Sequence, residues 1–198
     1  MCAESVRGFT LAECLGVVGL VSLTGSVAVP ALLDGRAWAQ SEAAARHVAS
    51  RLRFARLEAA RRGVQVALQV RSTSDPPGYR YAVVADGNGD GIRTADIAAG
   101  IDCRLGSEES LSELFSGVQF GLANGVTSVD PAEPIILGSP VRIGRWGLLS
   151  FGPDGGASGG TLYVLGQSNR QLAVRVLAST GRVRLLAYHP ERLEWVPR

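Results

Sequence analysis

The sequence predicts an α+β protein: a long kinked amino-terminal helix, half membrane-spanning and half amphipathic, packed on antiparallel β-sheet. Two observations predict the helix: an apolar run over residues 7–33 and a helical apolar pattern over residues 41–62. A third predicts the sheet: after Gly63, short runs rich in apolar residues alternate with clusters of glycine, proline and aspartate. In this arrangement we expect the apolar face of the helix to lie across the sheet.

The apolar run over residues 7–33 is long enough to cross the roughly 30 Å hydrocarbon core of a membrane as a helix. After Arg7 it carries a single charge, Glu13. A carboxylate inside such a run is unfavourable unless another group pairs with it. No small-residue cleavage site follows the run, so it differs from an ordinary secretory signal. The simpler alternative is a signal anchor in which Glu13 has no role.

The helix is expected to continue over residues 41–62 with one apolar face and arginines on the other sides. The apolar positions recur at three- to four-residue spacing: Val48, Leu52, Ala55 and Ala59. Pro30 removes a backbone donor, so we expect it to kink the helix or melt it locally. Gly63 is a natural helix end. The arginine-rich sides are interpreted as a solvated face, with anionic lipid or DNA as the alternative partner.

Eight short segments beyond Gly63 are predicted strands. They are Gln65–Arg71, Tyr79–Ala85, Val118–Leu122, Pro134–Ile143, Leu148–Phe151, Thr161–Leu165, Leu172–Leu177 and Arg182–Ala187. Turn clusters such as residues 74–78, 152–156 and 179–181 separate several of them. Short strands joined by such turns are typical of antiparallel hairpins.

The six residues Gly8-Phe9-Thr10-Leu11-Ala12-Glu13 resemble the class III leader junction of type IV pilins and type II secretion pseudopilins. The resemblance implies that a prepilin peptidase cleaves between Gly8 and Phe9 on the cytoplasmic side. Phe9 would then be N-methylated, and the apolar run retained as an anchor. Glu13 would neutralise the Phe9 amine of an adjacent subunit. Such a buried pair can set the axial register between subunits, and Pro30 belongs to the same assembly segment.

The carboxyl-terminal half is similar to the GspH/FimT family of minor pilins. The resemblance rests on the turn Ser150-Phe151-x-Pro153-Asp154-Gly155 and the later runs 158–163, 172–176 and 180–184. It implies a pilin-like fold divided into a leader (residues 1–8), a transmembrane assembly segment (9–33) and an exported domain (34–198). In that domain residues 34–62 are the amphipathic helix and 63–198 are β-rich.

The segment from Asp86 to Asp96 begins as a calcium loop does. Oxygen-bearing side chains stand at its first, third and fifth positions, Asp86, Asn88 and Asp90, with glycine at the sixth and the Ile92 carbonyl at the seventh. Ile97 replaces the bidentate glutamate of an EF-hand, so Asp96 or Asp102 would have to close the shell. The segment therefore predicts either a weak Ca²⁺ site or a glycine-rich turn.

A second motif is Gly181-Arg182-Val183-Arg184. In DNA-uptake members of the resembled family, a Gly-Arg-x-Arg pattern is associated with DNA binding, so the resemblance makes Gly181, Arg182 and Arg184 candidate DNA contacts. Arginines at a strand tip can bind phosphates without sequence preference, and the nearby Tyr188 and Trp195 are candidates for base stacking. The alternative is that the arginines simply point into solvent.

Nothing in the sequence indicates an enzyme. The two histidines have no evident catalytic partners, no phosphate-binding loop or Cys/His cluster is present, and the net charge of +2 argues neither for nor against nucleic acid. The sequence therefore predicts a structural minor pilin or pseudopilin that requires no cofactor. Its expected partners are prepilin peptidase, other pilins and the inner-membrane assembly platform, with DNA binding for transformation as the alternative. The amino terminus is expected in the cytoplasm and the domain outside it.

Overall fold

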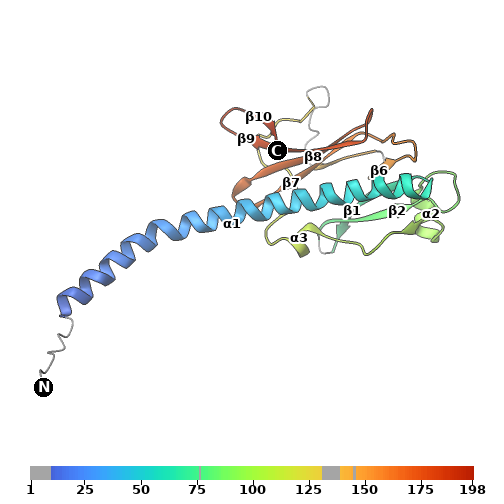
Figure 1. Ribbon diagram of the computed structural model, residues 1–198. Helices are drawn as coiled ribbons and strands as arrows, with labels where there is room; N and C mark the ends of the chain where they lie inside the picture. The colour runs from blue at the N-terminus through green and yellow to red at the C-terminus, as the bar shows by residue number, and fades with distance from the viewer. Residues whose placement is uncertain (1–9, 76, 131–138, 145) are drawn as a thin grey trace, which may run out of the picture. The chain divides into compact units, whose positions relative to one another are not determined.

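A computed structural model of the chain describes residues 10–75, 77–130, 139–144 and 146–198. The chain forms two compact units, Met1–Arg36 and Ala37–Arg198. Figure 1 shows the helices and strands coloured along the chain.

The helix α1 covers Leu11–Arg62. It ends because Gly63 adopts φ +69°, a conformation that glycine tolerates, while its N–H still bonds the Ala59 carbonyl at 3.0 Å. We expected Pro30 to kink the helix or to melt it locally. The helix continues through Pro30, so it does not melt there: one missing N–H removes one hydrogen bond from the ladder and leaves the others. Within the residues described, no helix is both long and apolar enough to cross a membrane. The spanning segment stays a prediction from the sequence.

In the second unit, burial along α1 follows the helical period. The buried residues are Ala37, Ser41, Ala44, Ala45, Val48, Ala49, Leu52, Ala55 and Ala59. Most of them are alanines, so the helix backbone can approach its neighbours closely. The apolar face predicted from the sequence is confirmed, since all four of its residues have no exposed surface.

Four strands form the first sheet, in the order β3-β2-β1-β6. Their bounds are β1 Val66–Ser74, β2 Pro77–Ala85, β3 Cys103–Arg104 and β6 Leu148–Phe151. β1 and β2 form a long antiparallel hairpin whose register runs from Val66 opposite Ala85 to Ser74 opposite Pro77.

The second sheet has the order β10-β9-β8-β7-β4, and β5 also pairs with β7. Its strands are β4 Gln119–Phe120, β5 Val141–Arg142, β7 Gly160–Leu165, β8 Gln171–Leu177, β9 Arg182–His189 and β10 Glu194–Pro197. The strand pairings among its described residues are antiparallel. Two short helices, α2 Thr94–Ala99 and α3 Leu111–Leu114, and a 3₁₀ turn at Gln167–Asn169 lie in the connections.

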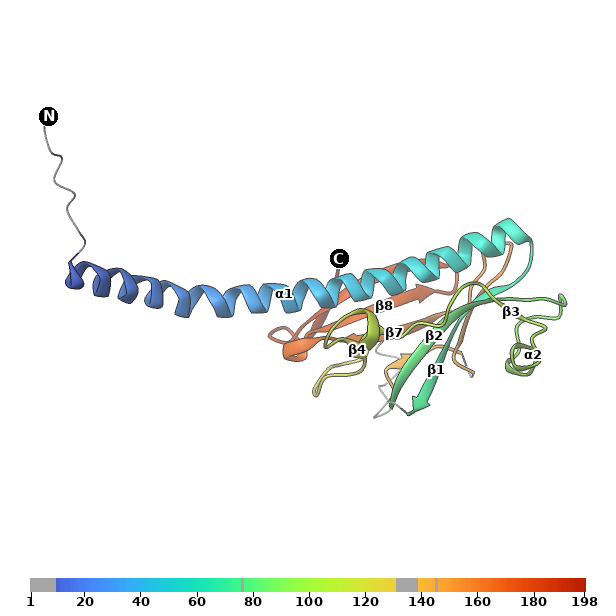
Figure 2. The ribbon, with the colours of Figure 1, turned by 90° about the horizontal axis from the view of Figure 1, so that it is seen from below.

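One hydrophobic core joins the carboxyl-terminal half of α1 to both sheets. Figure 2 shows this half of the helix running alongside the strands. Leu52 of the helix, Leu68 of β1 and Leu172 of β8 belong to it, and none has exposed surface. A smaller cluster of Tyr163, Ala173 and Leu186 is separate from this core. The expected α+β class, with a helix on antiparallel sheets, is confirmed.

The predicted strands differ from the observed ones mainly where the chain runs through loops. Of the strand expected over Pro134–Ile143, only Val141–Arg142 is a strand among the described residues, and 131–138 lie outside them. Of Val118–Leu122, only Gln119–Phe120 forms a strand, because it pairs with no more than the carboxyl end of β7 among the described residues. The sequence pattern did not predict β3, β10, α2 or α3, which are short and have few buried residues.

Candidate assembly and binding sites

At the amino terminus of α1, Glu13 is held by Thr10. The backbone N–H and the hydroxyl of Thr10 each donate to Glu13 Oε2 at 2.9 Å, and the Glu13 N–H donates to Thr10 Oγ1 at 3.2 Å. This reciprocal arrangement is a capping box, which satisfies N–H groups that the first turn of a helix leaves unpaired. The Thr-x-x-Glu spacing before an apolar run is the sequence signal of such a cap, although we predicted no cap there. Gly8 and Phe9, the predicted processing residues, lie outside the described residues.

Within its own chain, the Glu13 carboxylate is directed back toward Thr10 at the start of α1. Among the described residues, Glu13 Oε2 accepts hydrogen bonds from Thr10, the second residue after the predicted cleavage junction. The carboxylate therefore lies close in sequence to the position where cleavage would create a new amine. Its pairing with an amine of an adjacent subunit stays a prediction.

Two buried aspartates organise the loop predicted to bind calcium. Asp86 Oδ1 accepts the N–H groups of Asn88 and Gly89 at 3.1 and 2.7 Å, and its Oδ2 accepts that of Gly91 at 2.9 Å. Asp102, only 2% exposed, accepts N–H groups from both ends of the loop with its two oxygens. Carboxylates that accept several backbone N–H groups can hold such a loop closed without a metal.

Two of the other predicted calcium ligands, Asn88 and Asp90, also have side-chain partners within the protein. The Asn88 side-chain oxygen accepts the Asp90 N–H at 3.3 Å, and Asp90 pairs with Arg93 at 2.8 Å. Ile92 donates its N–H toward Gln65, and Asp96 lies in the first turn of α2. The residues described contain no group of three or more His, Cys, Asp or Glu that could hold a metal ion. The geometry is that of a hydrogen-bonded turn, and calcium binding stays a prediction.

The predicted DNA contacts lie where β8 turns into β9. Gly181 adopts φ +60° in this turn, and Arg182 and Arg184 on β9 are exposed. Neither arginine forms an ion pair with any described residue. The other carboxyl-terminal arginines are engaged: Arg175 pairs with Asp130 at 2.6 Å, Arg192 pairs with Glu194 at 3.6 Å, and Arg170 and Arg198 stand over the Trp38 ring.

The two aromatic residues predicted to stack on bases are used inside the protein. The Trp195 indole donates to the Thr127 carbonyl at 2.9 Å, and the Tyr188 hydroxyl donates to the Gly125 carbonyl at 3.3 Å. Their rings also contact one another, with centroids 5.1 Å apart. These contacts attach the 121–130 segment to the second sheet, so the setting of the two rings does not favour base stacking.

A polar cluster that the sequence did not predict joins α1 to the segment before α3. His47 Nε2 lies 2.8 Å from Glu109 Oε2, and Arg51 forms an ion pair with the same carboxylate. Glu109 is also bonded through its backbone to Tyr81, which packs edge-on against His47. The Tyr81 hydroxyl is buried without a hydrogen-bond partner among the described residues, and burial raises its pKa to about 12. His47 and Glu109 lie 62 positions apart along the chain, so no local motif announces their contact.

The cluster makes stability depend on pH. Burial, and to a lesser extent the charge of Arg51, lowers the pKa of His47 below its usual value of 6.5. The neutral ring therefore contributes stability above about pH 6.5 that is lost as the pH falls through the folded-state pKa. Acidification from pH 7.5 to 5 should lower the melting temperature more in the wild type than in His47→Gln, by at most about 2–4 °C. Equal pH slopes in calorimetry would contradict this expectation.

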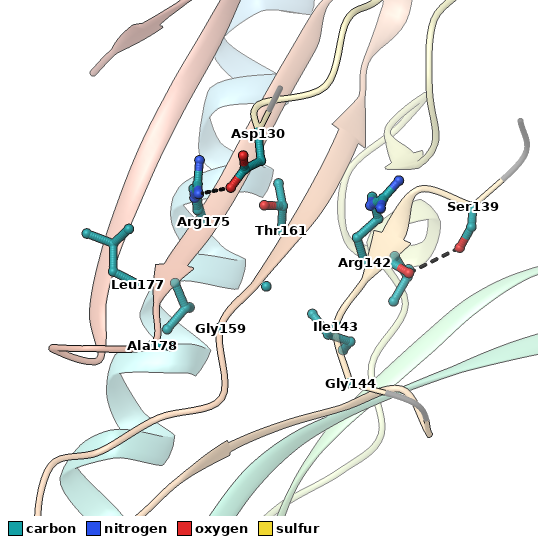
Figure 3. A pocket seen from close by; sticks show the side chains of 13 residues that line it. Asp130, Ser139, Arg142, Ile143, Gly144, Gly159, Thr161, Arg175, Leu177 and Ala178 are labelled. Carbon is teal, nitrogen blue, oxygen red and sulfur yellow. Dashed lines mark hydrogen bonds and ion pairs between the residues drawn. The ribbon is translucent and has the colours of Figure 1, made fainter. Parts of the chain in front are cut away.

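A polar cavity of about 750 Å³ opens beside β5, β7 and β8 (Figure 3). The Arg175–Asp130 ion pair lies on one side of it, and Thr161 and Arg142 project from neighbouring strands. Its described lining residues include no histidine or cysteine, and they show no nucleophile hydrogen-bonded to a base.

Residues 44–181, more than half of the chain, match the sequence profile of a family described as type II transport protein GspH. Among solved structures, the chain is similar to the minor pseudopilin EpsH from the type 2 secretion system of Vibrio cholerae, with 18% sequence identity and a TM-score of 0.45. That comparison covers 75% of this chain and 97% of that one. No curated protein matches the chain. The family match begins within α1 and ends at the turn before β9.

Proposed function

The chain belongs to the type II transport protein GspH family, and on that premise we propose that it is a minor pseudopilin or minor pilin. Its work is assembly rather than catalysis: it is a structural subunit at or near the tip of a type II secretion pseudopilus or a type IV pilus. The family match over residues 44–181 carries this proposal, because it covers most of the buried face of α1 and most of both sheets.

The amino-terminal residues supply the proposed mechanism of assembly. Prepilin peptidase removes residues 1–8, Phe9 is N-methylated, and residues 9–33 anchor the chain in the inner membrane with the amino terminus in the cytoplasm. The assembly platform then moves the subunit into the filament, where the amino-terminal parts of the helices pack through apolar contacts. Glu13, held by Thr10 near the new amino terminus, pairs with the amine of a neighbouring subunit.

The proposal is tested by expressing the full chain in cells that supply prepilin peptidase, the other pilins and the assembly platform. We expect mass spectrometry to show a mature chain that begins with N-methylated Phe9, and sheared filaments to contain this chain. A Gly8→Val variant is the control, because a bulky residue before the junction should block cleavage and keep the chain in the membrane fraction. An unprocessed wild-type chain, or one absent from filaments, would refute the proposal.

A second candidate function is DNA binding for uptake, and the exposure of Arg182 and Arg184 favours it. Both guanidinium groups lack an ion-pair partner among the described residues, so both are available for phosphates. A domain that presents them outside the membrane would contact DNA without reading its sequence.

Duplex DNA titrated into the full chain in a mild detergent tests this candidate. If the two arginines bind phosphates, Arg182→Ala/Arg184→Ala should weaken binding about tenfold or more and reduce the slope of log affinity against log salt by about 2. Arg192→Ala is the matched control, because Arg192 is an exposed arginine of the same carboxyl-terminal region but already faces Glu194. Absence of binding at low salt removes the candidate.

A further inference from the structure

A groove separates the exposed side of α1 from the β8–β9 turn. It encloses about 640 Å³, and both of its walls belong to the second compact unit. The helix wall is made by Arg53, Arg56, Leu57 and Ala60. The opposite wall is made by Gly181 of the turn and by Arg182 and Val183 at the start of β9. The four helix residues stand at positions i, i+3, i+4 and i+7, so they form one continuous stripe along α1. We call this surface the arginine groove.

The cationic side chains of the arginine groove are not neutralised by the described part of the protein. Arg53, Arg56 and Arg182 form no ion pair with described residues, and Arg56 donates a hydrogen bond to the Gly181 carbonyl at 3.4 Å. The carboxylate on the next helical turn, Glu58, is already shared by Arg61 and Arg62. The hydrogen bonds from Arg61 and Arg62 lower the pKa of Glu58 to about 2. The Glu58 carboxylate is therefore charged and already paired with these two arginines. Three positive charges therefore remain for a partner.

The arginine groove also has an apolar part. Leu57 is 69% exposed and Val183 is partly buried beside it, although most leucines of the second unit are buried. Gly181 suits this turn because it adopts φ +60° and because a Cβ there would lie 3.0 Å from the Gly155 carbonyl oxygen. A partner that covers this surface gains from burying Leu57 as well as from meeting the arginines.

We propose that the arginine groove docks an acidic segment of a neighbouring filament subunit, in which aspartate or glutamate side chains flank an apolar side chain. This inference rests on the proposed function, since it names the chemistry of the partner within the filament. Carboxylates would pair with Arg53, Arg56 and Arg182, while the apolar side chain covers Leu57. Bidentate pairing with arginine fixes the orientation of a carboxylate, which suits a surface that sets subunit register.

The composition of the groove favours a polypeptide over nucleic acid. A phosphate backbone pairs with arginines but has no apolar side chain to bury Leu57. Moreover, the motif predicted to bind DNA is divided by the structure: Arg182 lines the groove, whereas Arg184 is outside it and stands opposite Arg175 on β8. DNA binding through the predicted motif would therefore need Arg184, whereas docking of an acidic segment in the groove would not.

Photocrosslinking in cells that assemble the filament tests the proposal. A photoreactive residue at position 57 should yield an adduct with another filament subunit, and the crosslinked peptide should carry Asp or Glu beside an apolar residue. Arg53→Glu/Arg56→Glu should reduce the adduct at least tenfold, and changing the mapped carboxylates to arginine should restore it. Arg184→Glu, the matched control outside the groove, should leave the adduct within about twofold.

Each other outcome overturns the proposal. An adduct that maps to a basic or uncharged segment, or that survives the double charge reversal, shows that the arginines of the groove do not bind the partner. Loss of the adduct in Arg184→Glu, together with displacement by duplex DNA, assigns the surface to nucleic acid. If the wild type enters filaments but gives no adduct at position 57, the groove proposal fails and the proposed function stands. If the wild type is absent from filaments, both fail.

Discussion

Replacement of Glu13 with glutamine is expected to reduce incorporation of the chain into filaments by about 100-fold or more. In the proposed assembly, the Glu13 carboxylate neutralises an amine that has entered an apolar environment. Removing one partner of a buried ion pair typically costs about 3–5 kcal/mol, because the remaining charge is left uncompensated. Glutamine keeps the shape of the side chain and can still accept hydrogen bonds from Thr10, so the variant isolates the charge.

The measurement is the amount of mature chain in sheared filaments relative to the membrane fraction. Thr10→Val is the matched control: it removes the hydroxyl that caps α1 but keeps the carboxylate, and loss of a cap costs about 1 kcal/mol. We expect Thr10→Val to lower incorporation by about tenfold at most. If Glu13→Gln enters filaments as well as the wild type does, Glu13 acts only as a helix cap in its own chain.

Replacement of Leu52 with alanine is expected to destabilise the second unit by about 2–5 kcal/mol. Leu52 has no exposed surface and belongs to the core that joins α1 to both sheets. Truncation leaves a cavity where three elements meet, and a helix fixed against two sheets cannot move inward to fill it. The loss of stability should be as large in high salt as in low salt, since no charge is involved.

Leu57→Ala provides the matched control on the same helix. The two leucines are five residues apart, but Leu57 is 69% exposed, so its truncation should change stability by less than about 0.5 kcal/mol. Thermal unfolding of the full chain in a mild detergent measures both variants. A melting temperature lowered by about 5–15 °C in Leu52→Ala and unchanged in Leu57→Ala is the expected result. Equal shifts would mean that the helix is not fixed to the sheets through this face.

The variants probe three different surfaces of one helix. The buried alanine-rich face fixes α1 to the sheets, the Thr10–Glu13 cap lies at its amino terminus, and the arginine groove borders its exposed side near the β8–β9 turn. Because Leu57 lies on the exposed side, its truncation should leave the fold intact. A docking defect in Leu57→Ala could therefore not be attributed to unfolding.

Patterns that repeat along the chain were sufficient to predict the main elements. The spacing of Val48, Leu52, Ala55 and Ala59 identified the buried face of α1, and Gly63 identified its end, because a helix brings residues three and four apart onto one side. The alternating runs identified β1, β2 and β6–β9 within a few residues. The sequence also showed Glu13 as an unusual charge, although its capping partner Thr10 was not predicted.

Contacts between distant segments could be decided only by the tertiary structure. Nothing near His47 or Arg51 in the sequence indicates Glu109, and nothing near Arg182 indicates the stripe of Arg53, Arg56 and Leu57 on α1. The calcium-like spacing from Asp86 likewise left open whether its oxygens face a metal or the backbone, and the structure directs them to N–H groups. Local periodicity determines which face of an element is apolar. Which charges meet across elements depends on how the sheets pack around the helix, and that packing is a property of the whole chain.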